Sequence, residues 1–127
     1  MEKLTLSLLP GLYGVCRFEE SSSALQYLKR CEQFISVTIA EDETSLVCSE
    51  DLIPPGVLAE RGFRALKISG PLAFSMTGVL SSLLAPLSAA SVSVFSISTY
   101  DTDYIFVKQS ALERSVEALR KVATVIS

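Results

Sequence analysis

The stretch that decides the fold is VSVFSISTYDTDYIFVK, residues 92–108. Valine, phenylalanine and isoleucine are interspersed with serines before Thr99, and a second apolar run follows Asp103. Two runs rich in β-branched and aromatic residues, joined by a short polar turn, are typical of a β-hairpin. The sequence therefore predicts strands over 92–99 and 104–108, joined by a turn at 100–103.

A second hairpin with the same layout is predicted earlier in the chain, with strands over 34–40 and 45–49. An offset of 59 positions superimposes the two hairpins without a gap, so that Ala40 falls on Thr99 and Val47 on Phe106. A strand and a helix are predicted before each hairpin. This pattern indicates an internal repeat of a βαββ unit.

Three further strands are predicted, over 4–9, 13–18 and 64–69. A helix beginning at Met76 has an apolar face with helical spacing, formed by Met76, Val79, Leu80, Leu83, Leu84 and Leu87. Its other face carries small residues, which fit either an interface or a solvated surface. Pro86 predicts a kink or an end of this helix.

A last helix is predicted from a capping box formed by Ser110 and Glu113, with apolar residues continuing to Ile126. A weaker helix follows the serines at 21–23 and is expected to bury Leu25, Leu28 and Cys31. Residues 51–62 contain Pro54-Pro55-Gly56 and are expected to form at most a turn or two.

These elements predict an α+β fold built from two ferredoxin-like modules of βαββαβ type, with antiparallel sheets and helices on one face. The expected division is a degenerate first module over 1–62 and a second module over 63–127. The two halves are expected to share strands or to pack side by side.

Composition narrows the class of protein. The chain has 127 residues, of which 49% are hydrophobic and 20% charged, which suits a globular fold with a sizeable core. A net charge of -3 without a basic run argues against nucleic acid as a partner.

Three cysteines without CxxC spacing fit a reduced, cytoplasmic setting, and no export signal is expected in the sequence. The uncharged segment 68–100 is interrupted by serine, glycine and proline, so no membrane span is predicted.

No enzyme chemistry is predicted. The chain has no histidine, and phosphate-binding, dinucleotide-binding and nucleophile-elbow motifs are absent from the sequence. Strand alternation places Cys16 and Arg17 on opposite faces, so Cys16 lacks an activating neighbour. The acidic turn Glu41-Asp42-Glu43 is interpreted as a solvated turn in preference to a cation site, and neither a metal nor a cofactor is predicted.

The hairpin turn at 100–103, taken alone, is either a plain bend or the edge of a site. The strand-to-helix loop at 70–75 favours a site, because the helix amides at Ser75 to Thr77 can receive a carboxylate. Asp103 or Asp101 can receive an ammonium group. Together these two poles match an amino acid zwitterion.

Three runs of residues carry a resemblance to a known family: FSMTGV at 74–79, APL at 85–87 and SVSVFSISTYDTDYIFV at 93–107. They resemble the ACT family, regulatory modules of βαββαβ fold that bind amino acids. The likeness extends to its tandem branch, which is similar to the ACT repeats of the cytosolic arginine sensors. It is strong over residues 60–125 and weaker over the first half.

The resemblance implies ligand contacts from the loop, the helix start and the hairpin, namely Ala73, Phe74, Met76, Gly78, Leu80, Thr99, Tyr100, Thr102 and Asp103. In the sensors an acidic loop residue meets the guanidinium of arginine, and Met76 stands at that position here. A small or apolar amino acid therefore fits this loop better than arginine.

The expected function is a non-enzymatic, cytoplasmic sensor module that binds an amino acid or a similar metabolite between modules or subunits, as a homodimer. The alternative is a ligand-free interaction protein that uses the same fold to dimerise or to regulate a partner enzyme. A small enzyme is a third reading, which would require a pocket with two perturbed titratable groups.

Overall fold

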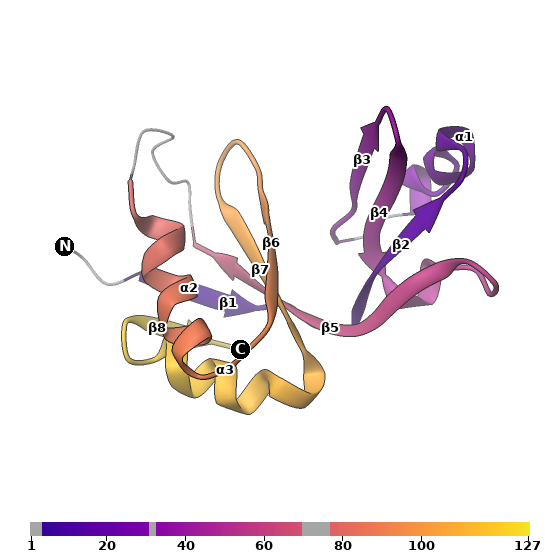
Figure 1. The fold of residues 1–127 in the computed structure, drawn as a ribbon. Helices are drawn as coiled ribbons and strands as arrows, with labels where there is room; N and C mark the ends of the chain where they lie inside the picture. Colours follow the sequence, from indigo (N-terminus) through magenta and orange to yellow (C-terminus); the bar gives the residue numbers. More distant parts are fainter. Residues whose placement is uncertain (1–3, 31–32, 70–76) are drawn as a thin grey trace. The chain divides into compact units, whose positions relative to one another are not determined.

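The computed structural model describes residues 4–30, 33–69 and 77–127 (Figure 1). These residues form an α+β fold with three α-helices, and its elements in chain order are β1 Leu4–Leu8, β2 Tyr13–Phe18, α1 Ser21–Leu25, η1 Leu28–Arg30, β3 Ser36–Ala40, β4 Glu43–Ser49, η2 Glu50–Leu52, β5 Leu58–Ile68, α2 Val79–Ala89, β6 Val94–Ser98, β7 Asp103–Lys108, η3 Gln109–Ala111, α3 Leu112–Leu119 and β8 Ala123–Ile126.

The chain divides into two compact units. One is Gly11–Phe63, here called the inserted unit, and the other joins Met1–Pro10 to Arg64–Ser127, here called the host unit. Strand β5 contributes its first part to the inserted unit and its last part to the host unit. This division differs from the expected one at Phe63 and at residues 1–10, the latter because β1 pairs with β8 and with the end of β5.

The inserted unit has a sheet with the strand order β3-β4-β2-β5 and antiparallel neighbours. Its core is formed by buried residues from the sheet and from the segments that cover it, namely Cys16, Phe18, Ala24, Leu46, Cys48 and Ile53. Gly14 allows a close approach in this core, since a Cβ atom there would lie 2.5 Å from Ile53 Cδ1 and 3.0 Å from the Glu60 carbonyl oxygen.

The host unit has the strand order β8-β1-β5-β7-β6. Strand β1 runs antiparallel to β5 but parallel to β8, so the expectation of purely antiparallel sheets is wrong for this pair. Helices α2 and α3 contact each other and bury Leu83, Leu87 and Leu119 in one core with residues of β1, β5, β7 and β8.

The two hairpins have equivalent registers, as the repeat predicts. Ser36 pairs with Val47 in the inserted unit, and the residues 59 positions later, Phe95 and Phe106, pair in the host unit. The same holds for Ile39 with Thr44 and for Ser98 with Asp103. The gap-free alignment of the hairpins is therefore confirmed at the level of backbone pairing.

Helix α2 has the predicted apolar face, since Val79, Leu83 and Leu87 are buried. The helix continues past Pro86 to Ala89 and then ends in a Schellman motif. There the Val92 amide donates to the Leu87 carbonyl oxygen at 2.9 Å, and Ser91 adopts a φ of 60°.

Three expectations about the helices are corrected. Helix α3 begins at Leu112 after a 3-10 turn and has no side-chain cap, so Ser110 and Glu113 do not form a capping box. It ends at Leu119, and the residues expected to continue it form β8. The helix expected after the serines at 21–23 is α1, which ends at Leu25. Leu25 and Leu28 are exposed, contrary to the expectation that they are buried, and Cys31 lies outside the described residues.

The uncharged segment 68–100 contains α2 followed by β6. Within the described ranges, the helices are all too short or too polar to cross a membrane.

Candidate ligand-binding site

The turn between β6 and β7 carries four of the residues that the sequence places at a site, Thr99, Tyr100, Thr102 and Asp103. Its two threonines close the turn, because the Thr99 amide donates to the Thr102 carbonyl oxygen at 2.8 Å. In return the Thr102 amide donates to Thr99 Oγ1 at 3.2 Å. A local network of this kind fixes the backbone of a turn.

Thr102 also attaches the turn to the end of β5. Its side chain is 6% exposed, and its hydroxyl donates to the Ile68 carbonyl oxygen at 2.7 Å. Ile68 is the last residue of β5 and precedes the loop that leads to α2. The turn is therefore held beside the strand that feeds the predicted binding loop.

Asp103 is the first residue of β7 and is partly buried. The Ser98 hydroxyl, from the paired position on β6, donates to its carboxylate. The other candidate acid, Asp101, is exposed at the tip, as is Tyr100, which is 83% exposed. Of the two described carboxylates, only that of Asp103 is held in a defined orientation by a side chain of the neighbouring strand, through the bond from Ser98.

The start of α2 is shaped by Gly78, whose φ of 74° is unfavourable for residues with a side chain. Its carbonyl oxygen accepts a bond from the Ser82 amide at 3.0 Å and one from the Ser81 hydroxyl at 3.2 Å. Leu80 is partly buried and packs against the host core. Leu80 therefore anchors the first turn of the helix.

The structure brings Thr99, Thr102 and Asp103 together next to Ile68. Ala73, Phe74, Ser75 and Met76 lie outside the described residues. Among the described residues, none of the hydrogen bonds joins Gly78 or Leu80 to the hairpin turn, so the assembly of loop and hairpin into one site stays a prediction.

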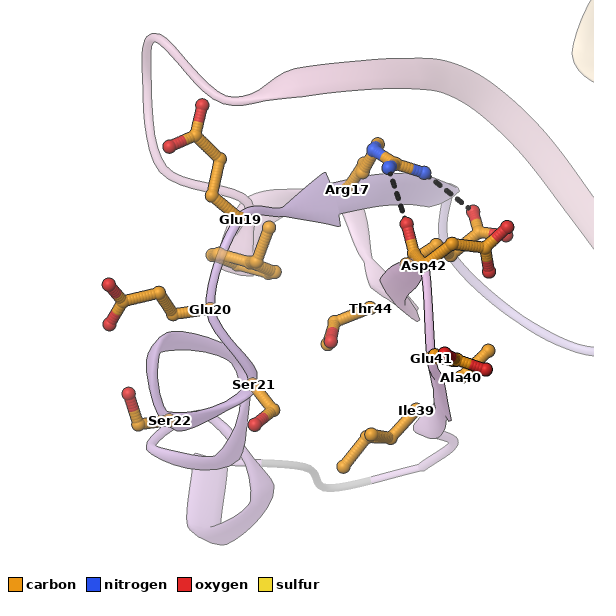
Figure 2. Close-up of a pocket in the computed structure, with 12 residues that line it drawn as sticks. Arg17, Glu19, Glu20, Ser21, Ser22, Ile39, Ala40, Glu41, Asp42 and Thr44 are labelled. Atoms are coloured by element: carbon orange, nitrogen blue, oxygen red, sulfur yellow. Dashed lines mark hydrogen bonds and ion pairs between the residues drawn. The ribbon is translucent and has the colours of Figure 1, made fainter.

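The inserted unit has a hollow of about 680 Å³ at the position that corresponds to this site in the repeat. It is lined by residues 17–22, where β2 leads into α1, and by residues 39–44 around the β3–β4 turn (Figure 2). By the hairpin alignment, Thr44 occupies the position of Asp103. From the sequence, a solvated turn is preferred to a cation site here, and the repeat is the signal that points to a hollow at this position.

Cys16 and the acidic side chains are the groups considered from the sequence for catalysis and metal binding. Cys16 is buried while Arg17 is exposed, as strand alternation predicts. Burial raises the pKa of the Cys16 thiol, and the positive charge of Arg61 partly offsets this effect. Across residues 4–30, 33–69 and 77–127, no cluster of three histidine, cysteine or acidic side chains is arranged to hold a metal ion.

The chain is similar in sequence to known amino acid sensors. A cytosolic arginine sensor for mTORC1 (subunit 1) from Bos taurus is 32% identical over 102 residues, covering 72% of this chain and 31% of the sensor. The chain thus spans about a third of the length of the curated relatives that it matches.

A structural-genomics crystal structure from Agrobacterium tumefaciens is 32% identical, covers 99% of this chain and 94% of its own, and superimposes with a TM-score of 0.87. The ligand-free regulatory subunit of aspartate kinase from Thermus thermophilus is 10% identical, with a TM-score of 0.66 and coverage of 92% of this chain and 95% of that one. At that identity the second likeness concerns the fold alone.

Two family profiles match the sequence. One is described as an N-terminal domain and matches residues 11–56, within the inserted unit. The other is the ACT domain, and it matches residues 58–121, which include β5, both host helices and the β6–β7 hairpin. The chain belongs to the ACT domain family.

Proposed function

We propose that this protein is a non-enzymatic, cytoplasmic ACT-type regulatory module that binds an amino acid or a related small metabolite. The proposed site is in the host unit, between the loop that precedes α2 and the β6–β7 turn. In this proposal the inserted and host units are two ferredoxin-like modules that share β5.

The observation that carries this proposal is the hydrogen bond from the Thr102 hydroxyl to the Ile68 carbonyl oxygen. It holds the turn with Asp103 beside the end of the strand from which the binding loop departs. A plain solvated bend needs no buried threonine, whereas a binding site requires polar groups held in place before the ligand arrives.

The proposed chemistry uses two poles. Asp103 receives the ammonium group of the ligand, and the amides at Ser75 to Thr77 receive its carboxylate. Ala73, Phe74, Met76, Gly78 and Leu80 surround the side chain of the ligand, while Thr99, Tyr100 and Thr102 form the hairpin side. Met76 is uncharged, which favours a small or apolar amino acid over arginine.

The relatives support a regulatory role. The name of the curated relative describes an arginine sensor, and one neighbour in fold is the regulatory subunit of an aspartate kinase. Both are consistent with a module that recognises an amino acid and passes the signal to a partner.

A homodimer is part of the proposal, with the ligand close to the subunit contact. Strand β6 is an edge strand of the host sheet, and its sequence VFSIS contains no charge. Natural edge strands are commonly protected by charged residues or proline, so this one is suited to a second copy. The exposed small residues Ser81, Ala85 and Ser88 of α2 offer a second contact surface. Sedimentation equilibrium measures the dimer.

Substitution of Asp103 by asparagine tests the ligand site. Calorimetry with the proteinogenic amino acids should identify a binder, and Asp103→Asn should weaken it by about 10-fold to 100-fold, because a charge-assisted hydrogen bond is lost. The matched control is Asp101→Asn, which removes an equal charge from the exposed tip of the same turn and should leave affinity nearly unchanged.

Two results contradict the proposal. Equal affinity of the Asp103→Asn variant and the unmodified chain would remove Asp103 from the site. Absence of binding across the whole panel would favour the alternative of a ligand-free interaction protein, for which the exposed face of α2 is the observation in favour.

A further inference from the structure

The hollow in the inserted unit has a threonine side chain in its wall. Thr44 is 6% exposed and lines the hollow. Among the described residues, no protein group forms a hydrogen bond with the Thr44 hydroxyl. Figure 2 shows this side chain in the space between the start of α1 and Ile39. In the described part of the chain, the buried side-chain atoms that lack a partner are Glu50 Oε1 and Arg64 Nε, so Thr44 Oγ1 still reaches the open space of the hollow. A hydroxyl can both donate and accept, so a polar group that enters the hollow can bond to it.

Apolar surface lies beside this hydroxyl. Phe18 is 8% exposed in the wall, and Ile39, the register partner of Thr44, is 56% exposed. An isoleucine with more than half of its surface in water can bury that surface against a hydrocarbon stem. The hollow thus combines one polar contact with an apolar wall, as small-molecule sites commonly do.

The charges around the hollow select the sign of its ligand. Of the described residues that line the hollow, only Arg17 is a cation, and it is already engaged. Its guanidinium lies 3.2 Å from the Glu43 carboxylate and donates to the Asp42 carbonyl oxygen at 2.9 Å. The remaining carboxylates of the lining are those of Glu19, Glu20, Glu41 and Asp42. They leave an excess of negative charge, which attracts cations and repels anions.

The carboxylates do not converge on one point. Figure 2 shows Glu20 directed away from the hollow, on the opposite side from Glu41 and Asp42. Consistent with this, the part of the chain that the structure describes has no group of acidic side chains able to hold a metal ion. A spread of negative charge around a partly apolar hollow suits an organic cation better than a metal ion.

We propose that this hollow is a second ligand site, which takes a small aliphatic amine in its ammonium form. The stem of the amine packs on Phe18 and Ile39, and the ammonium group donates to Thr44 Oγ1 while the surrounding carboxylates stabilise its charge. This site differs from the proposed amino acid site, because a neutral threonine stands where the host unit has Asp103.

The experiment is a titration of the full chain with butylamine and 1,4-diaminobutane, followed by amide chemical shifts in NMR spectra. Butanoate at equal ionic strength is the matched anionic probe. We expect both amines to shift the resonances of residues 18–22 and 39–44 at millimolar concentration, and butanoate to leave them unchanged.

Thr44→Val removes the hydroxyl and keeps the shape of the side chain, so it should weaken amine binding about 10-fold. Thr44→Ser retains the hydroxyl and should bind like the unmodified chain. Glu41→Gln should weaken binding a few-fold by lowering the negative potential, whereas Glu117→Gln, on α3 in the host unit, is the control and should have no effect. Asp103→Asn should also leave amine binding unchanged, which separates this site from the proposed amino acid site.

The proposal is overturned if the amines cause no shifts in these segments, or if butanoate binds as tightly as butylamine. It is also overturned if Thr44→Val, shown by its spectrum to be folded, binds the amines with unchanged affinity. If Thr44→Val does not fold, the amine affinities of Glu41→Gln and Glu117→Gln are compared instead. Equal affinities of these two variants overturn the proposal.

Discussion

At the scale of single residues, the two hairpin turns differ in which polar groups they bury. Thr102 is buried and bonded to Ile68, while Thr44 is buried and unpaired among the described residues. Both threonines are flanked by polar residues in sequence, so composition and periodicity give no sign of their burial. The sequence located the turns, but the side-chain environment depends on neighbours that are distant along the chain.

Cys16 is predicted to react slowly with alkylating reagents in the folded protein. It is 2% exposed, and burial raises its pKa, so both access and the population of thiolate are reduced. Iodoacetamide labelling with and without urea, read by peptide mass spectrometry, measures the difference. Labelling in native buffer as fast as in urea would contradict it.

The same raised pKa gives a pH dependence of stability. The folded state holds the Cys16 proton more tightly than the unfolded state does. Its contribution to the free energy of unfolding is therefore complete below the pKa of the unfolded thiol and is lost as pH rises through the folded-state pKa. A Cys16→Ala variant should lack this alkaline loss.

At the scale of elements, the strands and helices that depend on residues close in sequence were predicted correctly. The strands of both hairpins and the apolar face of α2 are confirmed. Strand β8 was missed because Leu119, Ala123 and Ile126 continue a helical spacing, although the helix ends at Leu119. The first part of β5 was missed because a Pro-Pro-Gly run precedes it and its pairing with β2 is non-local.

The end of α2 provides the prediction at this scale. Ser91 occupies the left-handed position of the Schellman motif, where glycine is the favoured residue. Ser91→Gly should therefore stabilise the protein by about 0.5–1 kcal/mol, because the strain of the serine is removed. Thermal unfolding measures the gain.

The matched control is Ser88→Gly, an exposed position inside the same helix. There the substitution should destabilise by about 0.5–1 kcal/mol, since glycine is a poor helix former. A loss of stability in Ser91→Gly comparable to that in Ser88→Gly would disprove the role assigned to Ser91.

At the scale of the whole molecule, the sequence predicted a boundary near residue 62 but not that the first strand belongs to the host unit. Strand β1 was predicted correctly as a strand, and its partners β5 and β8 are distant in sequence. No local signal specifies such pairing, because any apolar strand of similar length satisfies the same pattern. The assignment of residues 1–10 to the host unit could therefore not be predicted from the hydrophobic pattern alone.

The place of β1 in the host core can be tested with two leucines. Leu6 is 0% exposed in β1, whereas Leu58 is 75% exposed in β5. Leu6→Ala should lower the free energy of unfolding by about 2–5 kcal/mol through loss of buried surface and a cavity. Leu58→Ala should have a small effect. Guanidinium unfolding, followed by the helical circular dichroism signal that comes mainly from α2 and α3, measures both, and equal effects would contradict the assignment of β1 to the host core.

The insertion of one unit into the other also has a consequence for synthesis on the ribosome. All four strands of the inserted unit emerge before α2, so its sheet can close early. Strand β1 emerges before any of them, yet its parallel partner β8 follows only after α3. One edge of this apolar strand therefore stays open through most of translation, and the nascent chain must be kept from mispairing there until β8 arrives.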